Sequence, residues 1–171
     1  MLLGRPRPPT PDPYAERMMA TIAKAAEIID ANLDLAEFAG PVPSEEVWVA
    51  ERQLGVTFPD SYREFLQKYG SGSFGGEPVY GLGVPDTDLP NVVWATEAIR
   101  TADDFFPSDL VVIQDTGQGD LLCLAMARMN DTNECPVVQW IPEMSFDEQM
   151  FEVQNTTFAH FLLRVARAAT R

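Results

Sequence analysis

Apolar residues in the N-terminal part of the chain recur every three to four positions, the spacing of an amphipathic helix. This spacing predicts helices over residues 14–38, 44–54 and 58–69. Ser44 stands at the start of the second helix, where a serine side chain can cap free backbone N–H groups. Gly55 follows the same helix and is its expected C-terminal stop.

The second half of the chain changes to the pattern of buried strands. Strands are expected over residues 110–113, 120–127 and 136–141, because each run is mostly apolar and bounded by turn residues. The polar stretches 116–119 and 129–134 between these runs predict turns. Successive strands with such short connections form an antiparallel meander.

Four further elements complete the expected fold. A Gly-rich stretch, residues 71–76, is expected to turn into a strand over residues 78–83. Asn91 is a suitable cap for a short helix, and Thr157 is a suitable cap for the last helix. Helices first, strands in the middle and a helix last predict an α+β fold in a single domain.

The chain has 171 residues, enough for one domain with its own hydrophobic core. Its first residues are so rich in proline that neither a helix nor a central strand fits them. We therefore expect a disordered Pro-rich arm (residues 1–13), an N-terminal helical extension (14–40) and the main domain (41–171).

Membrane and export signals are not evident. No apolar stretch approaches the length of a membrane span, and the N-terminus lacks the features of a signal peptide. Cys123 and Cys135 are offset on neighbouring strands if their hairpin is centred near Asp131, so a disulfide would need distorted geometry. Reduced cysteines without an export signal predict a cytoplasmic protein.

The formal net charge is −14, and the acidic residues are concentrated between positions 101 and 152. Arg128 is the only basic residue in that stretch. Such a field repels nucleic acids and anionic membranes and attracts basic proteins, although it also serves solubility. The acidic residues of this stretch are Asp103, Asp104, Asp109, Asp115, Asp120, Asp131, Glu134, Glu143, Asp147, Glu148 and Glu152.

Catalytic chemistry finds little support in the sequence. The single histidine, His160, has no metal-ligating partner three or four positions along its helix, and a Cys–His nucleophile pair is nearly excluded. No G-x-S-x-G motif and no calcium-loop pattern occur. Carboxylates are numerous enough to leave a metal-dependent enzyme as an alternative. We expect no enzyme activity, no cofactor and no metal site.

A series of motifs follows a recognisable order. The first set is Glu45-Glu46, Glu51, Leu54-Gly55-Val56, Phe58-Pro59-Asp60-Ser61-Tyr62-Arg63-Glu64-Phe65-Leu66 and Tyr69-Gly70. The later set is Tyr80-Gly81-Leu82-Gly83, Gly119-Asp120, Pro136-Val137-Val138, Phe158 and Phe161-Leu162. This order resembles the SUKH superfamily, which joins a fungal cell-wall assembly regulator to many bacterial immunity proteins of polymorphic toxin systems. The resemblance covers about residues 44–168.

The resemblance implies a mixed or mostly antiparallel sheet flanked by helices and a function in protein binding, typically the neutralisation of a toxin domain. It implies no catalytic residues. The leading hypothesis is therefore an immunity protein for a basic, nuclease-type toxin; the alternative is a cytoplasmic scaffold or regulatory module without a toxin partner. The expected contact residues are Asp115, Asp120, Glu134, Glu143, Asp147 and Glu148, with Trp140 as an aromatic anchor.

Overall fold

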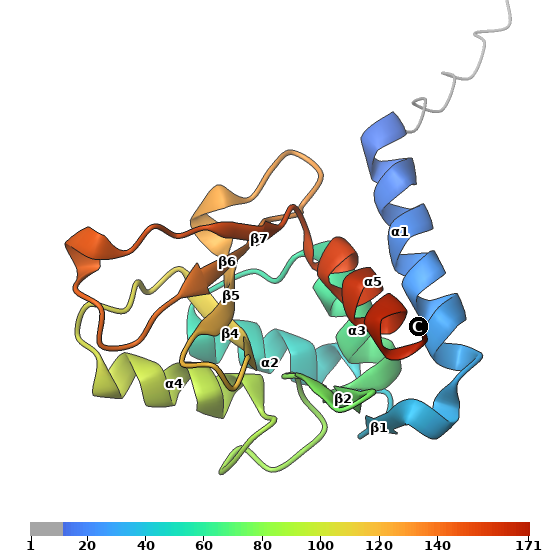
Figure 1. Ribbon diagram of the computed structural model, residues 1–171, viewed down its shortest axis with the longest axis horizontal. Helices are drawn as coiled ribbons and strands as arrows, with labels where there is room; N and C mark the ends of the chain where they lie inside the picture. Colours follow the sequence, from blue (N-terminus) through green and yellow to red (C-terminus); the bar gives the residue numbers. More distant parts are fainter. Residues whose placement is uncertain (1–11) are drawn as a thin grey trace, which may run out of the picture.

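The computed structural model describes residues 12–171 and has an α+β architecture (Figure 1). Its α-helices are α1 (Pro13–Asp30), α2 (Ser44–Leu54), α3 (Asp60–Tyr69), α4 (Val92–Ala102) and α5 (Phe158–Ala169). Its 3-10 helices are η1 (Leu33–Leu35), η2 (Met126–Arg128) and η3 (Phe146–Glu148). Its strands are β1 (Ala36–Phe38), β2 (Gly72–Phe74), β3 (Glu77–Val79), β4 (Leu110–Asp115), β5 (Leu121–Ala125), β6 (Val137–Trp140) and β7 (Val153–Asn155).

The strands form two antiparallel sheets, in the orders β1-β2-β3 and β4-β5-β6-β7. The second sheet confirms the predicted meander and adds β7 to it. The two sheets are linked where the backbone N–H of Tyr80, just after β3, donates to the carbonyl oxygen of Ile113 in β4 over 2.8 Å. The predicted fold class, α+β in a single domain, is therefore confirmed.

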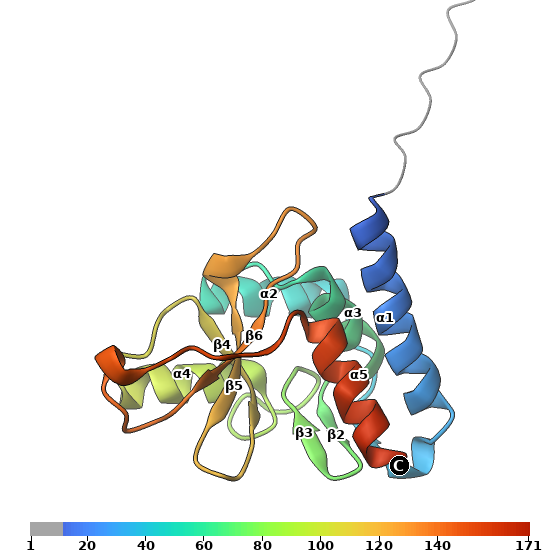
Figure 2. The ribbon, with the colours of Figure 1, turned by 45° about the horizontal axis from the view of Figure 1, so that its top comes forward.

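Helix α5 lies side by side with α1, and α3 also contacts α5 (Figures 1 and 2). The apolar face of α5 accounts for this packing, because Phe158 is fully buried against two aromatic side chains of α3. The ring centroids lie 4.9 Å from Tyr62 and 5.4 Å from Phe65. The Tyr62 hydroxyl donates to the carbonyl oxygen of Tyr80 over 2.8 Å, so its polar end is satisfied in the core.

Three predicted helix boundaries are confirmed by their backbone or side-chain geometry. Gly55 ends α2 in the left-handed conformation, with φ of 69°. Asn91 accepts a hydrogen bond from the N–H of Trp94 at the start of α4, and Thr157 accepts one from the N–H of His160 at the start of α5. Each of these residues therefore has the role that its position in the sequence predicts.

The N-terminal region differs from the prediction. The first helix ends at Asp30 and not at residue 38, because the following residues form η1 and then β1. Residues 1–11 of the predicted arm lie outside the described residues, and Pro13 begins α1. Ser44 is the first residue of α2, and Pro43 occupies the cap position. The Ser44 hydroxyl instead accepts a hydrogen bond from the side chain of Gln67.

The Gly-rich stretch is a strand and a tight turn, where only a turn was predicted. Gly72 begins β2 and pairs with Phe38 of β1. Its φ is +144°, and a Cβ atom there would collide with the carbonyl oxygen of Glu37, so glycine permits the close approach of β1. The strand predicted over residues 78–83 ends at Val79.

None of the helices in residues 12–171 is long and apolar enough to cross a bilayer.

Candidate protein-interaction surface

Glu134 is a structural residue and not a surface contact, which corrects the expectation from the sequence. Its side chain is buried at the start of α3, where it accepts hydrogen bonds from the backbone N–H and the hydroxyl of Ser61. Burial raises its pKa, and the nearby charges of Asp60 and Glu64 add to the rise, although the hydrogen bonds from Ser61 lower it. Glu134 therefore acts as a cap for α3.

Trp140 is also buried, with no exposed surface, so it does not form an aromatic anchor on the surface as expected. Its ring packs edge-on against Phe106 at a centroid distance of 5.3 Å and lies tilted against Phe151 at 5.8 Å. Phe151 in turn lies 5.7 Å from Phe146. A line of aromatic rings thus runs from the core at Trp140 to the half-exposed Phe146.

Asp115 and Asp120 lie at the β4–β5 turn and organise it. Asp115 accepts a hydrogen bond from the N–H of Gly117 over 2.8 Å, while Asp120 bonds to the hydroxyl of Thr116 and to the side chain of Gln139. Both residues line a polar cavity of about 450 Å³, which Arg164 also lines. Their charges are therefore partly engaged within the protein.

Glu143, Asp147 and Glu148 are exposed in the loop of residues 142–152, which contains η3. Gln149 holds this loop closed: its side-chain oxygen accepts from the N–H of Ile141, and its amide donates to the carbonyl oxygen of Ile141 over 2.6 Å. Glu143 and Phe151 near the two ends of the loop have positive φ values of 68° and 46°. Such backbone conformations are costly and often occur at functional loops.

An apolar groove, which we call the loop groove, lies beneath this loop and has a volume of about 690 Å³. The sheet contributes Leu110, Ala125 and Val138, and the loop contributes Phe146 and Phe151. Phe146 is 47% exposed. This groove was not predicted from the sequence. The signal that could have indicated it is Phe146, an apolar residue directly before the acidic Asp147 and Glu148 in a polar loop.

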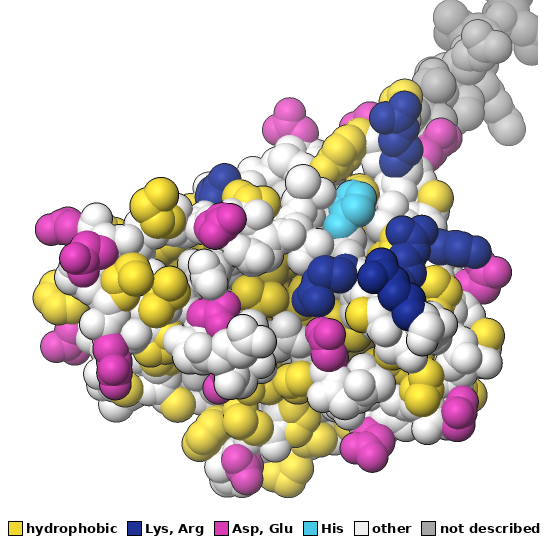
Figure 3. Space-filling view, viewed as in Figure 1, with side chains coloured by type: hydrophobic (Ala, Val, Ile, Leu, Met, Phe, Trp, Pro, Cys, Tyr) yellow, Lys and Arg dark blue, Asp and Glu magenta, His cyan; other side chains and the backbone are white. Residues whose placement is uncertain are grey.

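The surroundings of the loop groove are acidic. On the side of the molecule that carries η3, at the left of Figure 3, hydrophobic and acidic side chains lie together, whereas basic side chains gather over α5. Asp109 lines the loop groove, and Arg128 is the one basic residue in its lining. The four exposed acidic residues of the loop are Glu143, Asp147, Glu148 and Glu152. An apolar centre with a charged rim is the usual anatomy of a protein-binding surface.

The residues considered for catalysis have structural surroundings. Nδ1 of His160 lies 2.8 Å from the hydroxyl of Thr157, which caps the same helix. Cys123 and Cys135 are free, as the sequence predicts, and both are buried. Within residues 12–171, no three His, Cys, Asp or Glu side chains are grouped as a metal site would require.

The structure thus combines a two-sheet α+β domain with an apolar, acid-rimmed groove, an arrangement typical of a protein-binding surface. The chain belongs to the SUKH_5 family: the family model, described as SMI1-KNR4 cell-wall, matches residues 21–166. The resemblance to the SUKH superfamily is thereby confirmed. The match begins inside α1, and proteins of this family are generally protein-interaction modules.

Proposed function

We propose that this protein is an immunity protein that binds and neutralises a basic toxin domain, and that the loop groove with its acidic loop is the contact surface. The observation that carries the proposal is the half-exposed Phe146 between an apolar groove and the carboxylates of Asp147 and Glu148. An apolar anchor gives affinity, and surrounding charge selects a partner of opposite sign.

The charge also bears on the speed of capture. A net charge of −14 accelerates the encounter with a basic protein, and the acceleration falls as salt rises. Nuclease domains bind anionic phosphates and are therefore commonly basic at their active face. An inhibitor that covers such a face needs an acidic surface and no catalytic residues. We accordingly assign the protein no enzymatic activity and place its action in the cytoplasm.

The second candidate is a scaffold or regulatory module, which the cell-wall description of the family favours. Both candidates use the same surface, so the partner distinguishes them. The test is to express the toxin domain encoded beside this gene with and without this protein. We expect cells to survive only when the two are expressed together. Death of the cells despite soluble expression of this protein, or the absence of a toxin gene, would favour the scaffold.

A further inference from the structure

The loop groove does not end at the 142–152 loop. It shares Ser108 and Asp109 with a second cavity of about 490 Å³. That cavity shares Gly55, Val56 and Thr57 with a third cavity of about 360 Å³. Because each cavity shares lining residues with the next, the three cavities adjoin one another in a row, which we call the long groove.

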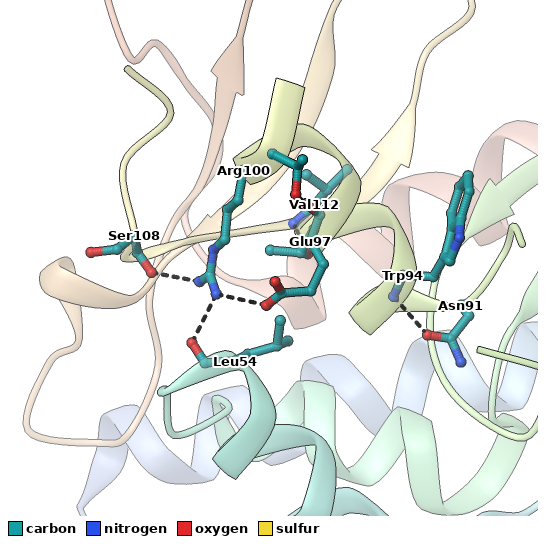
Figure 4. Close-up of polar contacts among 9 residues, drawn as sticks. Leu54, Asn91, Trp94, Glu97, Arg100, Ser108 and Val112 are labelled. Atoms are coloured by element: carbon teal, nitrogen blue, oxygen red, sulfur yellow. Dashed lines mark hydrogen bonds and ion pairs between the residues drawn. The ribbon is translucent and has the colours of Figure 1, made fainter. Parts of the chain in front are cut away.

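Arg100 fixes the two walls of the long groove relative to each other (Figure 4). Its Nη1 donates to the carbonyl oxygen of Leu54 over 3.1 Å, at the end of α2. Its Nη2 donates to the carbonyl oxygen of Ser108 over 2.6 Å, in the segment before β4. One guanidinium therefore ties α2 to the segment that forms the middle of the groove.

Apolar side chains are placed at both ends of the long groove and in its middle. Phe146 lies at the loop end, Met126 and Met129 line the middle cavity, and Trp48 lines the far end. Trp48 is 55% exposed, and the guanidinium of Arg52 lies 4.7 Å from its ring centre. Methionine adapts to different ligand shapes, and tryptophan is a frequent centre of binding energy.

The charge of the long groove differs between its two ends, so a charged ligand has a preferred orientation in it. The loop end lies beside four exposed carboxylates of the 142–152 loop. At the Trp48 end, Glu51 pairs with Arg63, and the guanidinium of Arg52 lies over the indole ring, so two positive charges stand against one negative charge. A ligand that lies along the groove is thus favoured when its positive charges are at the loop end.

We propose that the long groove binds an extended segment of the partner, with an apolar side chain at each end and Lys or Arg beside the one that meets Phe146. This inference rests on the proposed function, because it names the part of the partner that the surface recognises. A segment with separated anchors fits a row of three adjoining cavities, whereas a single side chain would occupy the loop groove alone.

The probe is a library of random linear peptides displayed on phage and selected on the immobilised full chain. We expect enriched peptides to carry two separated large apolar residues and Lys or Arg beside one of them. The Phe146→Ser and Trp48→Ser variants should each weaken binding of the best synthetic peptide about tenfold or more. Phe105→Ser and Met19→Ser are matched controls, since these side chains are 69% and 70% exposed outside the groove, and they should leave affinity unchanged.

A selection without a consensus, or an acidic consensus, would overturn the inference. So would a peptide that is sensitive to Phe146→Ser alone, because the groove would then not act as one site. If both groove variants fail to bind the peptide but still protect cells, the long groove is not the contact surface, whereas the immunity function stands. If the protein binds the peptide but does not protect cells from the toxin, the immunity function is contradicted, whereas the groove remains a binding site.

Discussion

Ser61 donates both its backbone N–H and its hydroxyl to the carboxylate of Glu134, which is 73 residues further along the chain, over 2.9 and 2.7 Å. The pair fixes the start of α3 to the loop that follows η2. Because α3 supplies Tyr62 and Phe65 to the core, this polar contact supports the packing of the whole helical side. Glu134 therefore acts on stability and not directly on recognition.

Glu134→Ala is expected to lower the free energy of unfolding by about 2 kcal/mol. The change leaves the N–H and the hydroxyl of Ser61 without their buried acceptor. Urea denaturation followed by circular dichroism measures the difference. Asp131→Ala removes the same charge from an exposed position of the same loop and should change stability by less than about 0.5 kcal/mol. Equal stability of the two variants would contradict the capping role.

Glu134 also predicts a pH dependence. Burial raises its pKa, so the native state holds this proton more tightly than the unfolded state does. The resulting contribution to stability is complete below the unfolded pKa and is lost as the pH rises through the folded pKa. As the pH rises above the unfolded pKa and through the raised folded pKa, wild-type stability should therefore fall relative to that of Glu134→Gln, which does not titrate. A difference that stays constant or grows with pH would refute this assignment.

Arg100→Met is expected to cost about 2 kcal/mol of stability, because two carbonyl oxygens lose a charged donor. Arg100→Lys should restore only part of the loss, since an ammonium group lacks the planar fork that spans both carbonyls. Thermal unfolding by calorimetry gives the comparison. Arg167→Met, at an exposed position of α5, is the control and should unfold close to wild type. If Arg100→Met were as stable as wild type, Arg100 would not be what holds the two walls of the groove together.

The two thiols should be unreactive in the folded protein. Burial raises the pKa of Cys123, and burial together with the charge of Glu134 raises the pKa of Cys135 to about 12. Ellman's reagent at about pH 8 should label neither thiol before denaturant is added and both afterwards. An Ala127→Cys variant, with its new thiol at an exposed position, should react at once and shows that the reagent is active. Rapid reaction of the native wild-type protein would contradict the described burial.

Local patterns predicted much of the fold. The apolar stripe of α3, the cap at Thr157 and the left-handed Gly55 depend on residues close together in the sequence. The end of α1 at Asp30 was missed, because the continuing apolar spacing to Leu33 looks helical although η1 and β1 follow. Pairing of β1 with β2 depends on residues far apart, which no local pattern records.

The candidate site was less predictable for the same reason. Glu134 looks exposed in a polar turn, and only its distant partner Ser61 shows that it is buried. The sequence alone does not tell which tryptophan is exposed: Trp140 is in the core, whereas Trp48 is half-exposed. The acidic character of the 142–152 loop was visible in the sequence. The groove beneath it was not, because β4, β5, β6 and the loop build it together.

The role of the acidic loop can be isolated with two variants of equal charge change. The loop variant replaces Glu143, Asp147 and Glu148 with lysine, all at exposed positions of the 142–152 loop. The control variant makes the same replacement at three other exposed acidic residues outside the loop groove. These are Glu27, Asp34 and Asp86. Both variants change the net charge equally, so a difference between them reports location and not total charge.

The most direct test is the dissociation constant of each variant for the proposed toxin partner, measured by titration calorimetry at low and at physiological salt. The account predicts that the loop variant binds about 100-fold more weakly than wild type, with the larger loss at low salt. The control variant should stay within about threefold of wild type at physiological salt, where distant exposed charges are screened. Equal affinities of the loop and control variants would contradict the claim that the acidic loop and its groove form the binding surface.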